Sequence, residues 1–189
     1  MEEAPTPYEL RKIRLIADYQ LGKGTGETLF PSKGLKLIHS KKTGRIRHIY
    51  LNGRLIATLR PKDGMLALTT HGGERLLKKL PIHKLPIVIV KSDVAQFVRD
   101  GKNLFCKHVV STSPEIRPGD EVLIIDEEHR LIAVGKAALG ADEMKTFKTG
   151  VAVKVRWGTS KPPQGRMQNL KGGPPRKIEP PQGKATKDR

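Results

Sequence analysis

The protein has 189 residues, of which 36 are Lys or Arg and 19 are Asp or Glu, so its formal net charge at pH 7 is +17. Such an excess of positive charge favours a polyanionic partner, either nucleic acid or an anionic membrane surface. No apolar run approaches the roughly 20 residues that a membrane-spanning helix needs, and the acidic N-terminus MEEAPTP lacks the apolar segment of a signal peptide. These features exclude a transmembrane protein and favour nucleic acid as the partner.

The cysteines and histidines limit which disulfide bonds and metal sites the protein can form. The single cysteine, Cys106, excludes an internal disulfide framework and is typical of a protein in the reducing cytosol. We therefore expect a cytoplasmic location. The six histidines show none of the usual ligand spacings, so we expect no metal site, and no motif calls for a cofactor.

The charge is unevenly distributed along the chain. The net charge is +11 over residues 8–80, +2 over residues 81–157 and +6 over residues 158–189. We interpret these regions as a basic N-terminal α+β module (1–80), a nearly neutral second domain (81–157) and a basic tail (158–189).

The N-terminal module begins with a predicted helix. In YELRKIRLIADYQ the residues Leu10, Ile13 and Ala17 share one face. The following GKGTG (22–26) is a glycine-lysine loop, but it lacks the Gly-Lys-Ser/Thr that a nucleotide-binding P-loop requires. We interpret these glycines as turn residues, with a backbone contact to an RNA phosphate as an additional possibility.

A β-hairpin is predicted next, because Asn-Gly in RIRHIYLNGRLIATLR is a strong two-residue turn signal. A third strand over MLALTT and a short helix over GGERLLKKL would complete the module. The basic run before and within the hairpin has two interpretations: a solvated surface or a surface that faces RNA. It consists of Lys41, Lys42, Arg45 and Arg47.

The second domain is predicted to be rich in short strands. PIVIV (86–90) is a buried strand, and Ser92 is a suitable N-cap for a helix whose inner face carries Val94, Phe97 and Val98. Gly101 is a natural helix stop. Four further strands, at 103–110, 116–126, 130–139 and 150–157, are interrupted by one short helix turn in ADEMKTF. Closely spaced short strands favour a small barrel, so the fold class is α+β, a small α/β module followed by a β-barrel domain.

The tail from residue 158 on contains three Pro-Pro pairs and almost nothing to bury. Such a composition predicts an extended, disordered segment. Its spaced bases, Lys161 and Arg166 among them, suit contacts along a phosphate backbone.

The second domain resembles the PUA domain, an RNA-binding module. The resemblance rests on FVRDGKNLFCKHVV, IRPGDEVLII, LIAVGKAAL and GVAVKVR in this order. It extends upstream through RKIRLIADYQLGKGTGETLF and TGRIRHIYLNGRLIATLRPKDGMLALTTHGGERL, so that residues 8–157 resemble the C-terminal part of archaeosine tRNA-guanine transglycosylases. Base exchange in that family takes place on a (β/α)₈ barrel of roughly 250 residues with a zinc site, for which this chain has neither the length nor the cysteines.

The resemblance also implies an RNA-binding surface, built by the helix, the loop after it and the closing strand. It maps onto Arg99, Gly101, Lys102, Lys107, His108, Lys154 and Arg156. Lys102 and Lys107 would donate to phosphate, and Gly101 would allow close approach of the backbone.

Two functions are consistent with these features. The first is a non-catalytic tRNA-recognition partner of an archaeosine transglycosylase-type enzyme, which grips the acceptor stem and end. The second is a ribosomal or ribosome-associated protein that binds rRNA and uses its tail between RNA helices. Catalysis is not expected, because the acidic residues fall in turns and at a helix start without a nucleophile or metal ligand beside them.

Overall fold

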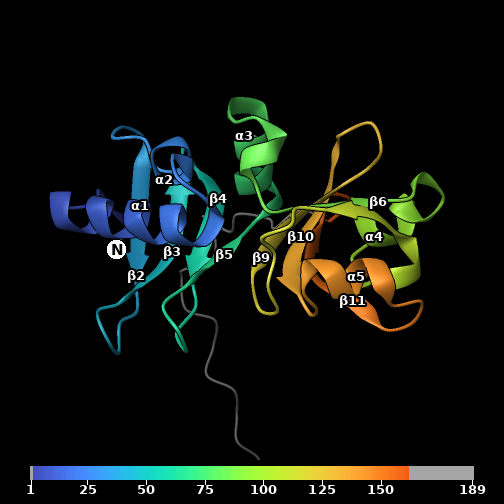
Figure 1. Ribbon diagram of the computed structural model, residues 1–189. Helices are drawn as coiled ribbons and strands as arrows, with labels where there is room; N and C mark the ends of the chain where they lie inside the picture. Colours follow the sequence, from blue (N-terminus) through green and yellow to red (C-terminus); the bar gives the residue numbers. More distant parts are fainter. Residues whose placement is uncertain (1, 162–189) are drawn as a thin grey trace, which may run out of the picture.

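A computed structural model describes residues 2–161 of the chain. Two sheets form the architecture, a five-stranded antiparallel sheet and a six-stranded sheet that curves into a barrel (Figure 1). The first has the order β1-β2-β3-β4-β5 and the second the order β7-β11-β10-β9-β6-β8. No helix among the described residues is long and apolar enough to cross a membrane. The two sheets and their helices give a mixed α/β fold with a nearly closed barrel in its second half.

The first sheet is covered by helix α1 (Pro7–Leu21), which lies across it in Figure 1. Thr6 caps this helix in a reciprocal capping box with Glu9, and Pro7 occupies the first turn. Its predicted inner face is confirmed, since Ile13 and Ala17 are fully buried. The remaining elements are α2 (Thr25–Leu29), β1 (Glu2–Glu3), β2 (Leu35–His39), β3 (Ile46–Leu51), β4 (Arg54–Leu59) and β5 (Leu66–Leu68).

The glycine-lysine loop connects α1 to α2, and its backbone is already bonded within the protein. Asp18 Oδ1 accepts the N–H groups of Gly24 at 3.0 Å and Gly26 at 2.8 Å. A Cβ on Gly26 would lie 2.3 Å from the Arg14 carbonyl oxygen, so this glycine permits the close approach of α2 to α1. The loop joins two helices, and the N–H groups of Gly24 and Gly26 already donate to the Asp18 carboxylate rather than to an external phosphate.

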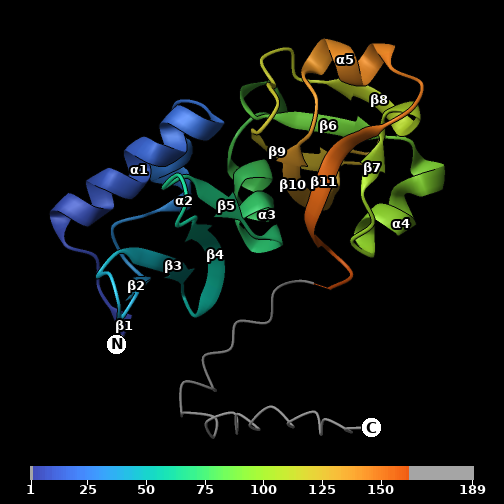
Figure 2. The ribbon, with the colours of Figure 1, turned by 90° about the horizontal axis from the view of Figure 1, so that it is seen from below.

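Helix α3 (Thr70–Lys79) stands between the two sheets in both ribbon views (Figures 1 and 2). It begins at Thr70, two residues before the predicted start, because Thr69 caps it. Its two glycines face opposite neighbours: a Cβ on Gly72 would lie 2.4 Å from the Ile56 carbonyl oxygen, and one on Gly73 would lie 3.0 Å from Val134. The helix therefore packs on β4 and on the barrel at once.

The barrel encloses a core of its own, while Ile87, Leu123 and Val134 join the core of the first sheet. Its strands come in the predicted chain order, except that one predicted strand is divided. They are β6 (Ile87–Val90), β7 (Leu104–Phe105), β8 (Val109–Thr112), β9 (Glu121–Ile125), β10 (Leu131–Ala137) and β11 (Val151–Gly158). β6 and β9 are parallel and the other pairs are antiparallel. The connections include 3-10 turns at Ile82–Lys84, Ser92–Val94 and Cys106–His108, and helices α4 (Ala95–Arg99) and α5 (Ala141–Thr146). Cys106 is buried in this core, as predicted.

The single strand predicted over 103–110 is wrong. A 3-10 turn at Cys106–His108 divides it into β7 and β8, which lie at opposite edges of the sheet order. β7 pairs with β11 and β8 pairs with β6. The chain therefore crosses the seam of the nearly closed barrel at this turn, and a continuous strand could not serve both edges.

Two expectations for the helix before this seam are also corrected. Ser92 does not cap α4; its N–H and hydroxyl both donate to Glu127 Oε2, at 3.0 and 2.6 Å. Phe97 is 63% exposed, while Ala95 and Val98 are the buried residues. The helix has only five residues, and its 3-10 entry turn rotates the expected apolar face.

Candidate RNA interface

The loop after α4 is shaped by the end of that helix. Gly101 adopts φ +91°, which is favoured by glycine, and its N–H donates to the Val98 carbonyl at 3.0 Å. The N–H of Lys102 donates to the Phe97 carbonyl at 3.0 Å, which closes the helix end and leaves the Lys102 side chain exposed. The predicted helix stop is confirmed, and Arg99, Gly101 and Lys102 share one short turn.

The segment after this loop is attached to β11 and to Gly150, the residue before that strand. Asn103 Oδ1 accepts the N–H of Val155 at 3.1 Å, and the N–H of Cys106 donates to the Gly150 carbonyl at 3.0 Å. Lys107 follows in the seam turn with an exposed side chain, and His108 beside it is half-buried. The backbone that carries Lys102 and Lys107 is thus held by the last strand, so both ammonium groups project from a fixed support.

Exposed aromatic side chains in this domain were missed by the sequence prediction. Phe97 and Phe105 are 63% and 46% exposed and flank the Gly101–Lys102 turn in the chain. Phe147 and Trp157, before and at the end of β11, are also exposed. The exposure of Phe105 could have been predicted from strand alternation, since Leu104 and Cys106 on either side of it are buried. Exposed rings beside cations suit unstacked bases.

Arg99 is held by a buried carboxylate. Its Nη2 lies 3.2 Å from Asp126 Oδ2, and the same oxygen accepts the Nε of Arg130 at 2.8 Å. Burial alone would raise the pKa of Asp126, but the hydrogen bonds from Arg130 and the charge of Arg99 bring it below the ordinary value. The guanidinium of Arg99 is therefore oriented by the fold while about a third of its side chain stays exposed.

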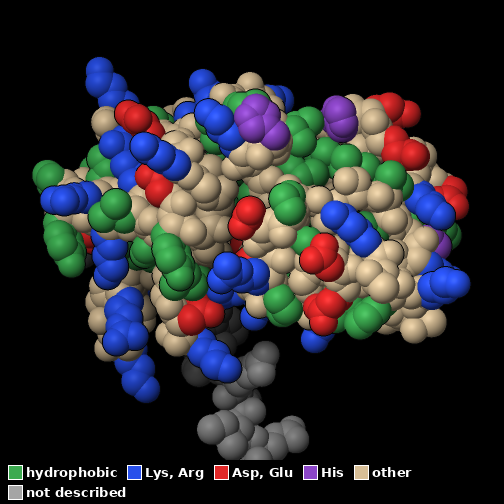
Figure 3. Space-filling model, viewed as in Figure 1, with side chains coloured by type: hydrophobic (Ala, Val, Ile, Leu, Met, Phe, Trp, Pro, Cys, Tyr) green, Lys and Arg blue, Asp and Glu red, His purple; other side chains and the backbone are tan. Residues whose placement is uncertain are grey.

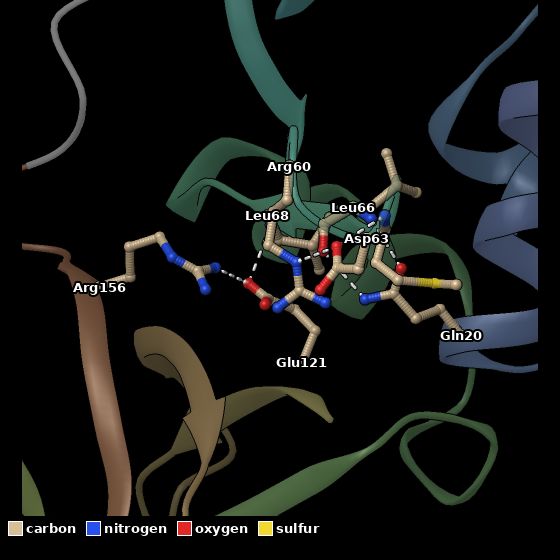
Figure 4. A network of polar contacts seen from close by, with 8 residues as sticks. Gln20, Arg60, Asp63, Leu66, Leu68, Glu121 and Arg156 are labelled. Atoms are coloured by element: carbon tan, nitrogen blue, oxygen red, sulfur yellow. Dashed lines mark hydrogen bonds and ion pairs between the residues drawn. The ribbon is translucent and has the colours of Figure 1, made fainter. Parts of the chain in front are cut away.

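Arg156 has a partner within the protein. Its Nη1 forms an ion pair with Glu121, a fully buried carboxylate at the start of β9 (Figure 4). The same Glu121 oxygen accepts the N–H of Leu68 from the first sheet at 2.9 Å. Burial raises the pKa of Glu121, and the hydrogen bond and charge of Arg156 oppose this rise. Arg156 therefore ties the last strand to the contact between the two sheets.

Lys154 lies two residues earlier on β11 and remains exposed. It pairs in register with Lys136 of β10, which is also exposed. Like charges directly opposite each other on neighbouring strands are destabilising. A bound anion would relieve this repulsion.

The predicted N-terminal cations are not brought to this loop. Lys41, Lys42 and Arg45 lie in the turn between β2 and β3, and Arg47 lies on β3; all four are exposed. This turn lies at one end of the molecule, whereas α4 lies at the opposite end (Figures 1 and 2). Lys and Arg side chains extend along the turn in Figure 3. Lys161, also exposed, ends the described chain, and Arg166 and most of the predicted tail lie outside it.

Two family models match the chain in succession. Residues 11–83 match the patch-forming domain C2 of tRNA-guanine transglycosylase, and residues 86–158 match the PUA domain. The chain is 45% identical over 153 residues to a tRNA-guanine(15) transglycosylase of Methanobrevibacter smithii. The alignment covers 81% of this chain and 23% of that protein. The chain thus spans about a quarter of the length of the curated relatives it matches.

Solved structures show the same fold. A hypothetical protein of Pyrococcus horikoshii superposes with a TM-score of 0.68 at 19% identity, covering 84% of this chain and 94% of its own. A PUA-domain protein of Thermoplasma acidophilum gives 0.62 at 20% identity, over 84% and 93% of the two chains. The chain therefore has a segment that matches the C2 domain of tRNA-guanine transglycosylase followed by a segment that matches the PUA domain, and together they correspond to the C-terminal part of those transglycosylases.

Proposed function

We propose that this protein binds tRNA without catalysing a reaction, and serves as the separate RNA-recognition partner of an archaeosine transglycosylase-type enzyme. The observation that carries the proposal is the pairing of the C2 and PUA domains, at 45% identity to an enzyme named for its action on tRNA. The matched part of that enzyme is its C-terminal quarter, without the barrel. The lone buried cysteine supports a cytoplasmic location.

The segment from α4 to the 3-10 turn Cys106–His108 supports a grip on the acceptor stem and its single-stranded end. Lys102 and Lys107 present exposed ammonium groups on a backbone attached to β11, which suits phosphate contacts. Phe97 and Phe105 present exposed rings beside them, which suits stacking with unpaired bases. A surface with both features favours the junction of a stem with a single strand.

The buried carboxylates support a passive role. Glu121 and Asp126 bind Arg156, Arg99 and Arg130 in structural ion pairs. Glu143 Oε2 accepts the N–H of Gly140 at the start of α5.

Sedimentation of the native protein distinguishes this proposal from a ribosomal role. On a sucrose gradient at moderate salt, we expect the protein in light fractions together with tRNA or a transglycosylase-like subunit. The Pro-, Gly- and Lys-rich composition of residues 158–189 is the feature that favours a ribosomal role. Sedimentation with a large ribosomal particle would contradict the tRNA proposal.

Charge reversal at Lys102 and Lys107 tests the phosphate contacts. Lys102→Glu with Lys107→Glu is expected to lower tRNA affinity by at least tenfold and to reduce the salt slope by about 1.5, because each lost phosphate contact removes about 0.7–0.9. The melting temperature should stay nearly unchanged, since both side chains are exposed. Lys62→Glu with Lys84→Glu, also exposed, is the matched control. Equal affinities of the two variants would remove Lys102 and Lys107 from the interface.

Truncation of the exposed ring tests the contact with unpaired bases. Phe97→Ala is expected to weaken binding of tRNA with an intact 3′ end by about 1–3 kcal/mol, the range for one base stacked on an aromatic ring. Binding of the same tRNA with its single-stranded end removed should not change. Fluorescence anisotropy with both RNAs measures the difference. Equal losses for both RNAs would place Phe97 outside the contact with the single strand.

A further inference from the structure

A second basic surface lies on the C2 domain, whereas Lys102 and Lys107 lie on the PUA domain. A groove of about 480 Å³ runs between α3 and the β3–β4 hairpin. One wall carries His71, Arg75 and Lys78, which are spaced i, i+4 and i+7 and so share a face of α3. The other wall carries Asn52 and Arg54, and Lys79 completes the basic lining.

The walls of this groove are held rigidly by contacts beneath them. The hydroxyl of Thr69 donates to the Leu55 carbonyl at 2.7 Å, and Gly72 allows α3 to lie directly against Ile56 of β4. At the edge of the groove, Arg75 Nε donates to the Thr28 carbonyl at 2.6 Å. The cations are thus presented by two elements that cannot separate without breaking these contacts.

The charge of the groove is unbalanced. Arg54, Lys78 and Lys79 are exposed, and none of them forms an ion pair within residues 2–161. Four Lys and Arg side chains line the groove against one carboxylate, Glu74. Lys78 and Lys79 lie in the last helical turn, where they complement the helix dipole. The dipole does not account for Arg54, which faces the helix from the hairpin.

We propose that this groove binds the phosphodiester backbone of the RNA duplex. The inference rests on the proposed function and adds a second contact on the other domain. The groove contains no Phe, Tyr or Trp, so it lacks the rings on which single-stranded bases stack. Arg and Lys side chains on two walls are the groups that contact duplex phosphates. Helix α3 stands between the first sheet and the barrel, with Lys and Arg side chains gathered around it (Figure 3). Because α3 packs on the barrel through Gly73, a duplex bound in the groove would lie next to the second domain.

The test neutralises the groove and measures binding to a duplex. The probe is a blunt RNA hairpin stem of about 16 base pairs, which has no single-stranded end to contact Phe97 and Phe105. Arg54→Gln with Lys78→Gln and Lys79→Gln is expected to weaken binding on the order of tenfold or more and to reduce the salt slope by about 2. Arg11→Gln with Lys12→Gln and Lys23→Gln removes the same charges from exposed positions on α1 and its loop, and should change binding much less.

The outcomes separate the groove from the proposed function. Equal binding of the hairpin by the groove variant and the α1 control would overturn the proposal that the groove binds duplex RNA. Weaker tRNA binding by Lys102→Glu with Lys107→Glu would in that case still support the contact on the PUA domain. Failure of the unaltered protein to bind either the hairpin or tRNA in dilute buffer would overturn both proposals. If the unaltered protein bound anionic vesicles rather than RNA and the groove variant did not, the groove would be a lipid-binding surface. That result would overturn the proposal that it binds duplex RNA.

Discussion

Replacement of Arg156 by methionine is expected to lower the free energy of unfolding by about 3–5 kcal/mol. The loss comes from Glu121, which is fully buried and whose ion pair is with Arg156. Without that guanidinium, a carboxylate would remain buried with the Leu68 N–H as its hydrogen-bond donor. Because Leu68 belongs to the first sheet and Glu121 to the barrel, the damage falls where the two domains meet (Figure 4).

The pH dependence of this loss follows from the pKa of Glu121. Burial raises that pKa in the folded protein, and removal of Arg156 takes away an interaction that lowers it. A carboxyl whose folded pKa lies above its unfolded value binds more protons in the native state, so the free energy of unfolding falls as pH rises through that interval. We therefore expect the deficit of Arg156→Met to be smaller at about pH 5 than at about pH 8 in urea denaturation.

Two variants control this experiment. Glu121→Gln added to Arg156→Met removes the buried charge while its amide oxygen can still accept from Leu68, and should recover much of the lost stability. Lys154→Met, at an exposed position two residues away on β11, should change stability by less than about 0.5 kcal/mol. A double variant no more stable than Arg156→Met would show that the stranded carboxylate is not the cause.

Replacement of Gly158 by alanine is expected to cost about 3 kcal/mol or more of stability. A Cβ at this position would lie 1.9 Å from the carbonyl oxygen of Arg99 and 2.9 Å from that of Val98. Both obstacles are backbone, so no side-chain rotation relieves them. The end of β11 passes directly against the end of α4, and the alanine would displace the turn that carries Gly101 and Lys102. Weaker tRNA binding should therefore accompany the loss of stability.

Gly44→Ala is the matched control for this substitution. Gly44 has φ +64° with nothing within 4 Å of an added Cβ, so alanine there meets backbone strain of about 1–2 kcal/mol and no collision. It lies in the β2–β3 turn, far from α4. Thermal melts and tRNA titrations of both variants give the comparison. Equal losses of stability would show that the contact between β11 and α4 is not tight.

The sequence predicted local elements well where the signals were local. The α1 helix, the Asn-Gly hairpin and the Gly101 helix stop depend on neighbouring residues, and the structure confirms them; the Thr6 capping box of α1 was not predicted. The face of α4 was mispredicted because five residues provide too short a period to assign the buried side. The strand over 103–110 was mispredicted because its two halves join different barrel edges, which is a property of the closed sheet.

The presence of short strands, the excess of basic residues and the PUA resemblance could be determined from the sequence, because they depend on composition, alternation and motif order. Which cations are available to a ligand was decided by tertiary structure alone. Lys154 is exposed and Arg156, two residues later, is paired with Glu121, since only the folded sheets bring β9, β11 and Leu68 together. The groove between α3 and the hairpin likewise exists only because Gly72 and Gly73 let one helix contact both domains.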